Sequence, residues 1–207
     1  MTTERSVDVL IVGAGISGID AAYHLQREFP GRTFELVDRQ QSFGGTWRTH
    51  KYPGIRSDSD LYTFGFSWKP WTGVPIATAD EILAYLNEAI DEQDIRRHIR
   101  YRKSVVNAEW SSDSSHWTVT IHDLDTSERE TITCNFMWMC QGYYRHEKGY
   151  TPDFPGMNDF AGAIVHPQEW PEDLDYHDKN VVVIGSGATA ATLVPAMAQD
   201  CRHITML

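Results

Sequence analysis

A glycine-rich turn between a short apolar run and a helical segment sets the narrowest limit on how this chain can fold. Residues 7–12 are almost all apolar, which is typical of a strand buried on both faces. Gly13-Ala-Gly-Ile-Ser-Gly18 follows, and helical spacing then continues over residues 16–29 until Pro30-Gly31. A second strand is predicted over residues 33–37. The pattern makes one strand–helix–strand unit of about 30 residues, the length that a parallel crossover needs.

The three glycines of this turn have separate physical uses in a dinucleotide site. Gly13 permits the tight turn, Gly15 lets the backbone approach a pyrophosphate, and Gly18 allows the helix to pack closely on the strand. The helix start offers free N–H groups and a positive dipole end to phosphates. Asp38, about 20 residues past Gly18, is expected to bind a ribose diol. A glycine turn that binds no ligand is the alternative.

A second turn of the same kind begins at Gly185. Gly185-Ser-Gly-Ala-Thr-Ala190 lies between a strand predicted over 181–184 and a helix predicted over 189–198, with another strand at 203–207. The final alanine is tolerated in this pattern. By analogy with Asp38, the position that separates NADP from NAD preference falls at about residue 210. The start of a second dinucleotide-binding unit is therefore predicted.

Composition and charge exclude several classes of function. The net charge of −11 does not suit a nucleic-acid partner, which needs clustered Lys and Arg. Residues 1–6 do not read as a signal peptide, and the apolar run at 9–12 is too short to cross a bilayer. Three cysteines without metal-like spacing predict no metal site, and they indicate a reducing, cytoplasmic setting.

The stretch between the two turns is irregular at first and then regular. Residues 40–78 show no periodicity, and a loop of this length is usually functional. Thr78-Ala-Asp-Glu81 reads as a capping box at a helix start. Three strands are predicted over 105–110, 117–121 and 131–140. Proline-rich residues 150–176 read as a linker. We expect three parts: a first domain over 1–150, a linker over 151–178 and the start of a second domain over 179–207.

These motifs together resemble one family. The chain is similar to the N-terminal portion of class B flavoprotein monooxygenases, the Baeyer–Villiger monooxygenase family. The resemblance covers the whole chain and is most specific in Phe-x-Gly-x-x-x-His-x-x-x-Trp-Pro. The residues that carry it are Gly13 to Gly18, Gly44 to Trp47, Tyr52 to Asp60, Cys140 to Tyr144, Phe160 to Pro171 and Val181 to Ala190.

The resemblance implies an α/β, Rossmann-like, three-layer fold that binds FAD, with the start of a second Rossmann-like domain for NADP(H). The residues it implies for FAD are Gly13, Gly15, Ser17, Gly18, Asp38, Gly45, Thr46, Trp47, Asp58, Val105 and Gln141. Those it implies for NADP(H) are Arg56, Ser57, Asp58, Gly185, Ser186, Gly187, Ala188, Thr189 and Ala190. Asp58 would also orient a catalytic arginine that lies beyond Leu207 in the family, and His166 would act indirectly, as a linker residue.

The implied activity is a monooxygenase reaction in which NADPH reduces FAD and O₂ then oxidises a ketone, a sulfide or a thioamide. We expect the chain alone not to complete it, because the family's catalytic arginine and substrate pocket have no counterpart here, and we expect weak FAD retention. A non-catalytic FAD-binding module is one alternative. A flavin disulfide reductase is another, although it needs an early redox cysteine pair. Trp47 as ordinary core and a surface ion pair between Arg56 and Asp58 are the local alternatives.

Overall fold

The computed structural model describes residues 4–145 and 147–207. Two compact units form: the chain up to Arg48 with Leu83–Tyr143, and Thr49–Ile82 with Tyr144–Leu207. The domain limits expected from the sequence stay a prediction. No helix in the described ranges is long and apolar enough to cross a bilayer.

The first unit and the loop that follows it contain β1 (Glu4–Val12), α1 (Ile16–Glu28), β2 (Phe34–Val37), α2 (Thr46–Thr49), α3 (Leu61–Phe64), α4 (Ala79–Glu92), η1 (Arg96–His98), β3 (Ile99–Arg100), β4 (Lys103–Ser111), β5 (His116–Asp123) and β6 (Arg129–Met139).

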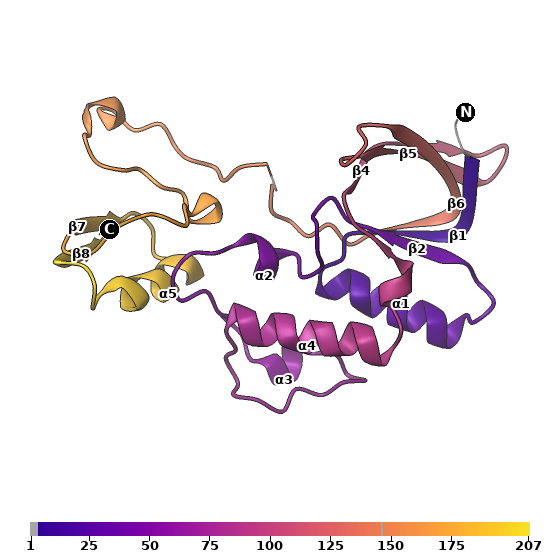
Figure 1. Cartoon of the computed structure of the whole chain (residues 1–207), viewed down its shortest axis with the longest axis horizontal. Coiled ribbons are helices and arrows are strands. Elements are labelled where there is room, and N and C mark those ends of the chain that lie inside the picture. Colours follow the sequence, from indigo (N-terminus) through magenta and orange to yellow (C-terminus); the bar gives the residue numbers. More distant parts are fainter. Residues whose placement is uncertain (1–3, 146) are drawn as a thin grey trace. The chain divides into compact units, whose positions relative to one another are not determined.

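The first unit is built on one six-stranded sheet in the order β3-β2-β1-β6-β5-β4. β1, β2, β3 and β6 run parallel, whereas β4, β5 and β6 form an antiparallel meander. β6 belongs to both parts, because it pairs with β1 along most of its length and with β5 only as far as Cys134. The meander curls away from the parallel strands, and α1 lies along β1 and β2 (Figure 1). This is the Rossmann-like α/β arrangement that the sequence predicts.

Helix α1 packs closely on the sheet because its inner face is small and apolar. Gly18, Ile19, Ala22 and Leu25 are buried at helical spacing. A Cβ on Gly18 would lie 1.8 Å from the Gly13 carbonyl oxygen, so the helix can start only with glycine at this position. The predicted use of Gly18 is therefore a property of the fold itself.

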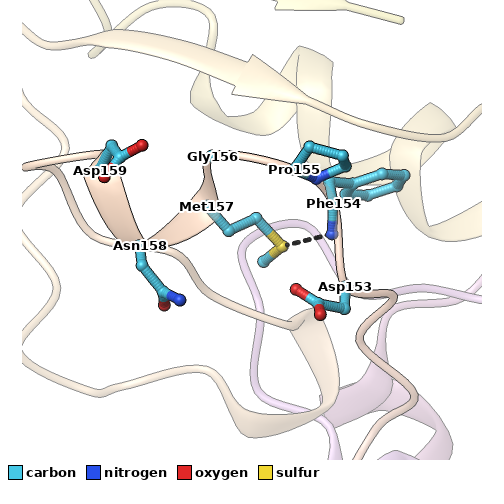
Figure 2. A pocket seen from close by; sticks show the side chains of 7 residues that line it. All are labelled: Asp153, Phe154, Pro155, Gly156, Met157, Asn158 and Asp159. Carbon is cyan, nitrogen blue, oxygen red and sulfur yellow. Dashed lines mark hydrogen bonds between the residues drawn. The ribbon is translucent and has the colours of Figure 1, made fainter.

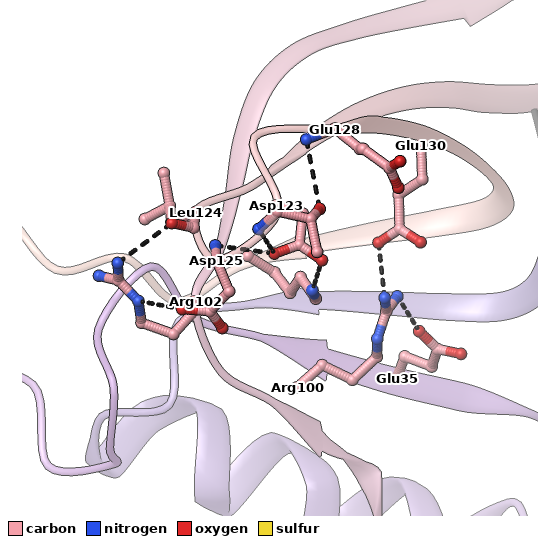
Figure 3. A network of polar contacts seen from close by, with 10 residues as sticks. Glu35, Arg100, Arg102, Asp123, Leu124, Asp125, Glu128 and Glu130 are labelled. Atoms are coloured by element: carbon pink, nitrogen blue, oxygen red, sulfur yellow. Dashed lines mark hydrogen bonds and ion pairs between the residues drawn. The ribbon is translucent and has the colours of Figure 1, made fainter.

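Ion pairs fasten the meander to the parallel strands (Figure 3). The Arg100 guanidinium bridges Glu35 of β2, at 3.1 Å, and Glu130 of β6, at 2.6 Å. All three side chains are largely buried, so water screens these contacts less than at an open surface. Lys103 pairs with Asp123 and, with the amide of Asp125, lowers the pKa of Asp123 to about 2. These contacts fix the chain where it enters β4.

The second unit contains a small parallel sheet and its crossover helix. Its elements are η2 (Met157–Asp159), η3 (Pro167–Glu169), β7 (Asn180–Val183), α5 (Ala188–Met197) and β8 (His203–Met206). β7 and β8 are parallel and in register, Val181 opposite Ile204. Its core contains buried Tyr52, Leu193 and Met197, with Ile55, Trp170, Tyr176, Val181, Val183, Cys201 and Ile204 packed around them. The loop 49–82 thus contributes to the core of this unit.

Most predicted elements are confirmed, and the differences are confined to short pieces. The segment 40–78, predicted to be irregular, contains the short helices α2 and α3. Residues 96–100, for which no element was predicted, form η1 and β3. Each of these pieces is four residues or fewer, too short for a hydrophobic period to register. The capping box is confirmed: the Thr78 amide and hydroxyl donate to Glu81, and the Glu81 amide donates to the Thr78 hydroxyl.

Gly18→Ala should destabilise the first unit, because its Cβ would overlap the Gly13 carbonyl oxygen. We expect the free energy of unfolding to fall by about 2 kcal/mol or more, as for other overpacked sites. Urea unfolding followed by tryptophan fluorescence measures the effect. Gly31→Ala is the matched control, because a Cβ there meets no atom within 4 Å and should change stability by less than about 0.5 kcal/mol. Equal midpoints for the two variants would contradict the close packing.

Candidate functional site

The first glycine turn is held between the ends of three strands. Gly13 has a φ of +109°, and its amide donates to the Val37 carbonyl at 2.8 Å, at the end of β2. A Cβ on Gly13 would lie 2.4 Å from the Cys140 carbonyl oxygen, just past β6. Both the conformation and the space at Gly13 therefore require glycine.

Gly15 leaves the start of α1 open. It is the N-cap residue, and no described side chain caps the helix there. The first helical N–H groups and the positive end of the helix dipole are therefore available to an anion. A Cβ on Gly15 would lie 3.7 Å from Gly45 Cα, an ordinary contact, so the protein's own packing does not require glycine at this position. A bare backbone at this point suits a closely approaching pyrophosphate. Ser17, in the first turn, is exposed.

Asp38 lies where the sequence predicts, directly after β2, but much of its carboxylate is already engaged. One oxygen accepts from the Ala14 amide at 2.6 Å and the other from the Gln40 amide at 2.7 Å. Asp38 is 9% exposed. A carboxylate has about four acceptor positions, so two remain for ribose hydroxyls. Asp38 thus also braces the glycine turn against the second strand.

The segment Gly44–Trp47 returns to the glycine turn. The Gly44 amide donates to the Ala14 carbonyl at 3.0 Å, which places Gly45 beside Gly15. Thr46 begins α2, and Thr46 and Trp47 are half-buried. Gly45 therefore lies against the first glycine turn, and Thr46 and Trp47 follow it directly in the chain.

Two further backbone segments lie beside the same turn. The Lys103 amide donates to the Asp38 carbonyl at 2.9 Å, so Val105, two residues on in β4, lies near Asp38. Val105 also packs against the core of the sheet. The Cys140 amide donates to the Val12 carbonyl at 2.8 Å, which brings exposed Gln141 next to the turn. The structure therefore gathers every FAD residue implied by the resemblance, except Asp58, within the first unit.

The second glycine turn repeats the first in detail. Gly185 has a φ of +125°, and its amide donates to the Leu207 carbonyl at 2.8 Å, as Gly13 does to Val37. The N-cap Gly187 has φ −78° and ψ −175°, against −77° and −172° at Gly15. A Cβ on Gly185 or Gly187 would meet no described atom within 4 Å.

The repeat places the remaining residues of the second turn. Ser186 and Ala188 are exposed, Thr189 is half-buried, and Ala190 is buried in the position of Gly18. Leu207 accepts from Gly185 as Val37 accepts from Gly13. The position near 210 that would separate NADP from NAD preference lies outside the described residues and stays a prediction.

The loop residues Arg56, Ser57 and Asp58 belong to the second unit. Ser57 is 3% exposed; its amide donates to the Ala77 carbonyl at 2.8 Å and its hydroxyl accepts from the Ala77 amide at 3.1 Å. Arg56 and Asp58 are exposed. Neither forms an ion pair with any residue that the structure describes, which disfavours the surface ion-pair alternative. Ser57 anchors the loop, and its two charged neighbours point to solvent.

His166 caps a short helix in the second unit. Its Nδ1 accepts from the Gln168 amide at 3.2 Å, and its ring covers Gly149, where a Cβ would lie 2.1 Å from Nδ1. Trp170 of the same motif packs into the core with Tyr176, whereas Phe160 is exposed. These are structural contacts, and they agree with an indirect role for His166, which stays a prediction.

A surface hollow in the same segment does not coincide with either turn. It is lined by the consecutive residues Asp153–Asp159, with the Met157 sulfur accepting from the Phe154 amide at 3.1 Å (Figure 2). Asp153 and Asp159 would repel phosphates. We therefore assign no ligand to this hollow.

The cysteines cannot form the redox pair that a disulfide reductase needs. Cys134 and Cys140 are free, and six positions along an extended strand separate them by about 20 Å. A disulfide requires Cα atoms within about 7 Å. Burial, with the nearby charge of Asp20, raises the pKa of Cys140 to about 11. In residues 4–145 and 147–207, no cluster of His, Cys, Asp and Glu is suited to hold a metal ion.

Three residues around these sites make contacts that the sequence does not signal. Lys103 binds Asp38 through its backbone, and no side-chain pattern signals such a contact. Tyr52 and Gly54 attach the Arg56 loop to α5. The Pro53-Gly54 pair is a turn signal, but it does not say what the turn packs against.

Comparison with known proteins agrees with this geometry. The profile of the "Flavin-binding monooxygenase-like" family matches residues 75–206, and that of a "NAD(P)-binding Rossmann-like domain" matches residues 11–72. The "FAD-containing monooxygenase EthA" of Mycobacterium tuberculosis is 51% identical over 97% of the chain, and the "Probable FAD-binding monooxygenase AlmA" of Acinetobacter baylyi is 48% identical over 99%. The chain spans 41% of the length of each.

Solved structures show the same fold. Cyclohexanone-bound cyclohexanone monooxygenase in its "Rotated conformation" superposes with a TM-score of 0.82 at 30% identity, covering 99% of this chain and 39% of that one. "Oxidized steroid monooxygenase bound to NADP" superposes with a TM-score of 0.79 at 32% identity, covering 97% and 38%. Both similarities extend over both glycine turns.

Because its pKa is about 11, Cys140 should react slowly with iodoacetamide at pH 8. The thiolate fraction at that pH is about 200-fold smaller than for an ordinary thiol of pKa near 8.5. We expect alkylation, followed by mass spectrometry, to be at least about ten-fold slower in the native chain than in urea, and to accelerate as the pH rises toward 11. Rapid alkylation in the native chain, or a Cys134–Cys140 disulfide, would contradict this expectation and support the disulfide-reductase alternative.

Proposed function

This chain belongs to the flavin-binding monooxygenase-like family, and on that premise we propose that its first unit binds FAD and its second NADP(H). The observation that carries the proposal is the repeated turn: two strand–glycine–helix units with matching hydrogen bonds and N-cap angles. Each presents an uncapped helix start and a glycine whose Cβ position is free of close contacts. Backbone N–H groups and the helix dipole favour a pyrophosphate there, despite the net charge of −11.

The residues of the first unit fit FAD. Gly13, Gly15, Ser17 and Gly18 would surround the pyrophosphate at the start of α1. Asp38 would accept from the ribose through its two remaining acceptor positions, with Val105 nearby. Gly45 and Gln141 lie beside the turn, and with Thr46 and Trp47 they would contact the rest of the cofactor. The residues proposed to bind FAD in this unit are Gly13, Gly15, Ser17, Gly18, Asp38, Gly45, Thr46, Trp47, Val105 and Gln141.

The second unit would take NADP(H) at the start of α5. The turn Gly185–Ala190 would hold its pyrophosphate, and exposed Arg56 would supply a positive charge from the neighbouring loop. Asp58 is proposed to lie at the flavin and to orient a catalytic arginine, its role in the family. His166 would act only through the segment that it caps.

The proposed parent activity is an NADPH- and O₂-dependent monooxygenase reaction on a small ketone, sulfide or thioamide, carried out in the cytoplasm. Bound FAD would supply the oxygen chemistry, and the protein would position the reactants and exclude water. The names of the relatives support this class of activity. The chain spans about two fifths of the length of these relatives.

A pair of crossed variants tests the two cofactor sites. Gly15→Asp adds a carboxylate at an N-cap where alanine-sized bulk fits, so the helix should stay stable while the pyrophosphate is repelled. We expect Gly15→Asp to weaken FAD binding at least about ten-fold and to leave NADP⁺ binding unchanged. Gly187→Asp should do the reverse. Flavin fluorescence and isothermal titration with NADP⁺ measure the two affinities.

The control and the activity assay use the same proteins. Circular dichroism should show that both variants remain folded. If the folded variants bind both nucleotides like the unmodified chain, the assignment of the turns is wrong. NADPH-dependent O₂ uptake that a ketone stimulates, in the chain or in a longer product of its gene, would support the parent activity. FAD binding without NADPH oxidation would favour the non-catalytic module.

A further inference from the structure

In the second unit, Gly54 lies so close to helix α5 that no residue with a side chain would fit at its position. Gly54 has a φ of +75°, and a Cβ there would lie 2.6 Å from the Ala196 Cβ and 3.0 Å from the Thr192 carbonyl oxygen. Both partners belong to helix α5, and neither is the end of a flexible side chain. Carbon atoms normally stay about 3.5–4.0 Å apart. The loop backbone therefore rests directly on the helix, and only glycine allows it to do so.

The neighbouring residues make this contact a continuous attachment. Tyr52 is 8% exposed and packs with Leu193 and Met197, with Ile55 beside them. Thr192 and Ala196 are four residues apart, as are Leu193 and Met197, so the two pairs lie along neighbouring strips of α5. The loop from Tyr52 to Ile55 thus lies along these strips.

The charged residues of the loop follow closely along the chain after its contact with α5, in a segment held by hydrogen bonds. The Ala79 amide donates to the Ile55 carbonyl at 3.1 Å, and the Ser57 amide donates to the Ala77 carbonyl at 2.8 Å. Arg56 lies between these two bonds and two residues from Gly54. Because Arg56 is two residues from Gly54, a shift of the backbone at Gly54 reaches Arg56 over a short, hydrogen-bonded segment.

We propose that Gly54 is a positioning residue for the second nucleotide site, because its close contact with α5 fixes where Arg56 meets the phosphates of NADP(H). The same helix carries both partners of that site: its first turn follows Gly187, and its last turns support the loop at Gly54. This inference rests on the proposed function. The loop that contains Gly54 is part of the unit proposed to bind NADP(H), whereas the turn Gly44–Trp47 just before it belongs to the unit proposed to bind FAD.

Gly54→Ala in the purified chain is the direct test, with NADP⁺ as the probe. The added methyl must displace the loop by about 1 Å, enough to misalign a charge-assisted contact. We expect the Kd for NADP⁺ to rise about ten-fold, with FAD binding unchanged. Gly156→Ala is the matched control, since Gly156 has a similar φ of +84° and its nearest atom would be 3.9 Å away, so its Kd should stay near that of the unmodified chain.

A double-mutant cycle separates positioning from a general structural role. If Gly54 acts through Arg56, then Gly54→Ala should have little further effect on NADP⁺ affinity once Arg56→Gln is present. Ala196→Gly should recover part of the affinity of Gly54→Ala, because it removes the nearest clashing atom. Additive effects in the cycle, or equal affinities for Gly54→Ala and Gly156→Ala, would overturn the inference.

Two further results would be interpreted separately: an unmodified chain that does not bind NADP⁺, and a Gly54→Ala variant that does not fold. If the unmodified chain does not bind NADP⁺, the proposed function of the second unit fails, and the inference fails with it. If Gly54→Ala does not fold, Ala196→Ser adds a single oxygen at the same contact, and we expect it to raise the Kd in the same direction. An unchanged Kd in folded Ala196→Ser would count against the positioning role.

Discussion

Two backbone hydrogen bonds, from Gly13 to Val37 and from Gly185 to Leu207, are the constraint on which the rest of this protein depends. Each forms only if the first strand and the strand after the helix are adjacent and parallel, and only if the turn residue adopts a positive φ. In both turns the N-cap residue lies two residues later, and no described side chain caps the helix there. One local geometry thus sets the sheet order around each turn and leaves a site for an anion at each helix start.

This arrangement explains how an acidic protein can be suited to anionic cofactors. Neither turn contains a lysine or an arginine, so attraction for phosphate would come from N–H groups and aligned peptide dipoles. Such donors are fixed in position and do not change with pH. Asp38 would cost binding energy if it faced the pyrophosphate, but its oxygens bind the backbone at the strand end instead. Arg56 is an exposed cation that the loop adds in the second unit.

The grouping of the loop 49–82 with α5, β7 and β8 gives the long irregular segment a physical purpose. Tyr52 and Ile55 supply apolar core to a unit whose own sheet has two strands. A sheet of that size buries little surface by itself. The same packing that stabilises the unit also presents Arg56 and Asp58, so stability and the proposed binding role depend on the same few contacts.

The sequence by itself determined the two glycine turns, the strand–helix–strand units, the helix start at Thr78 and the family, because each is written in residues close together along the chain. It did not reveal the short helices α2 and α3 or strand β3, which are too short for a hydrophobic period to register. Only the tertiary structure decided that Lys103 meets Asp38, that Cys140 closes the space over Gly13, and that Gly54 rests on Ala196. Those contacts join residues from 65 to 142 positions apart, by the difference of their numbers. Periodicity and motifs describe neighbours along the chain, whereas a close approach of two backbones depends on how whole elements pack.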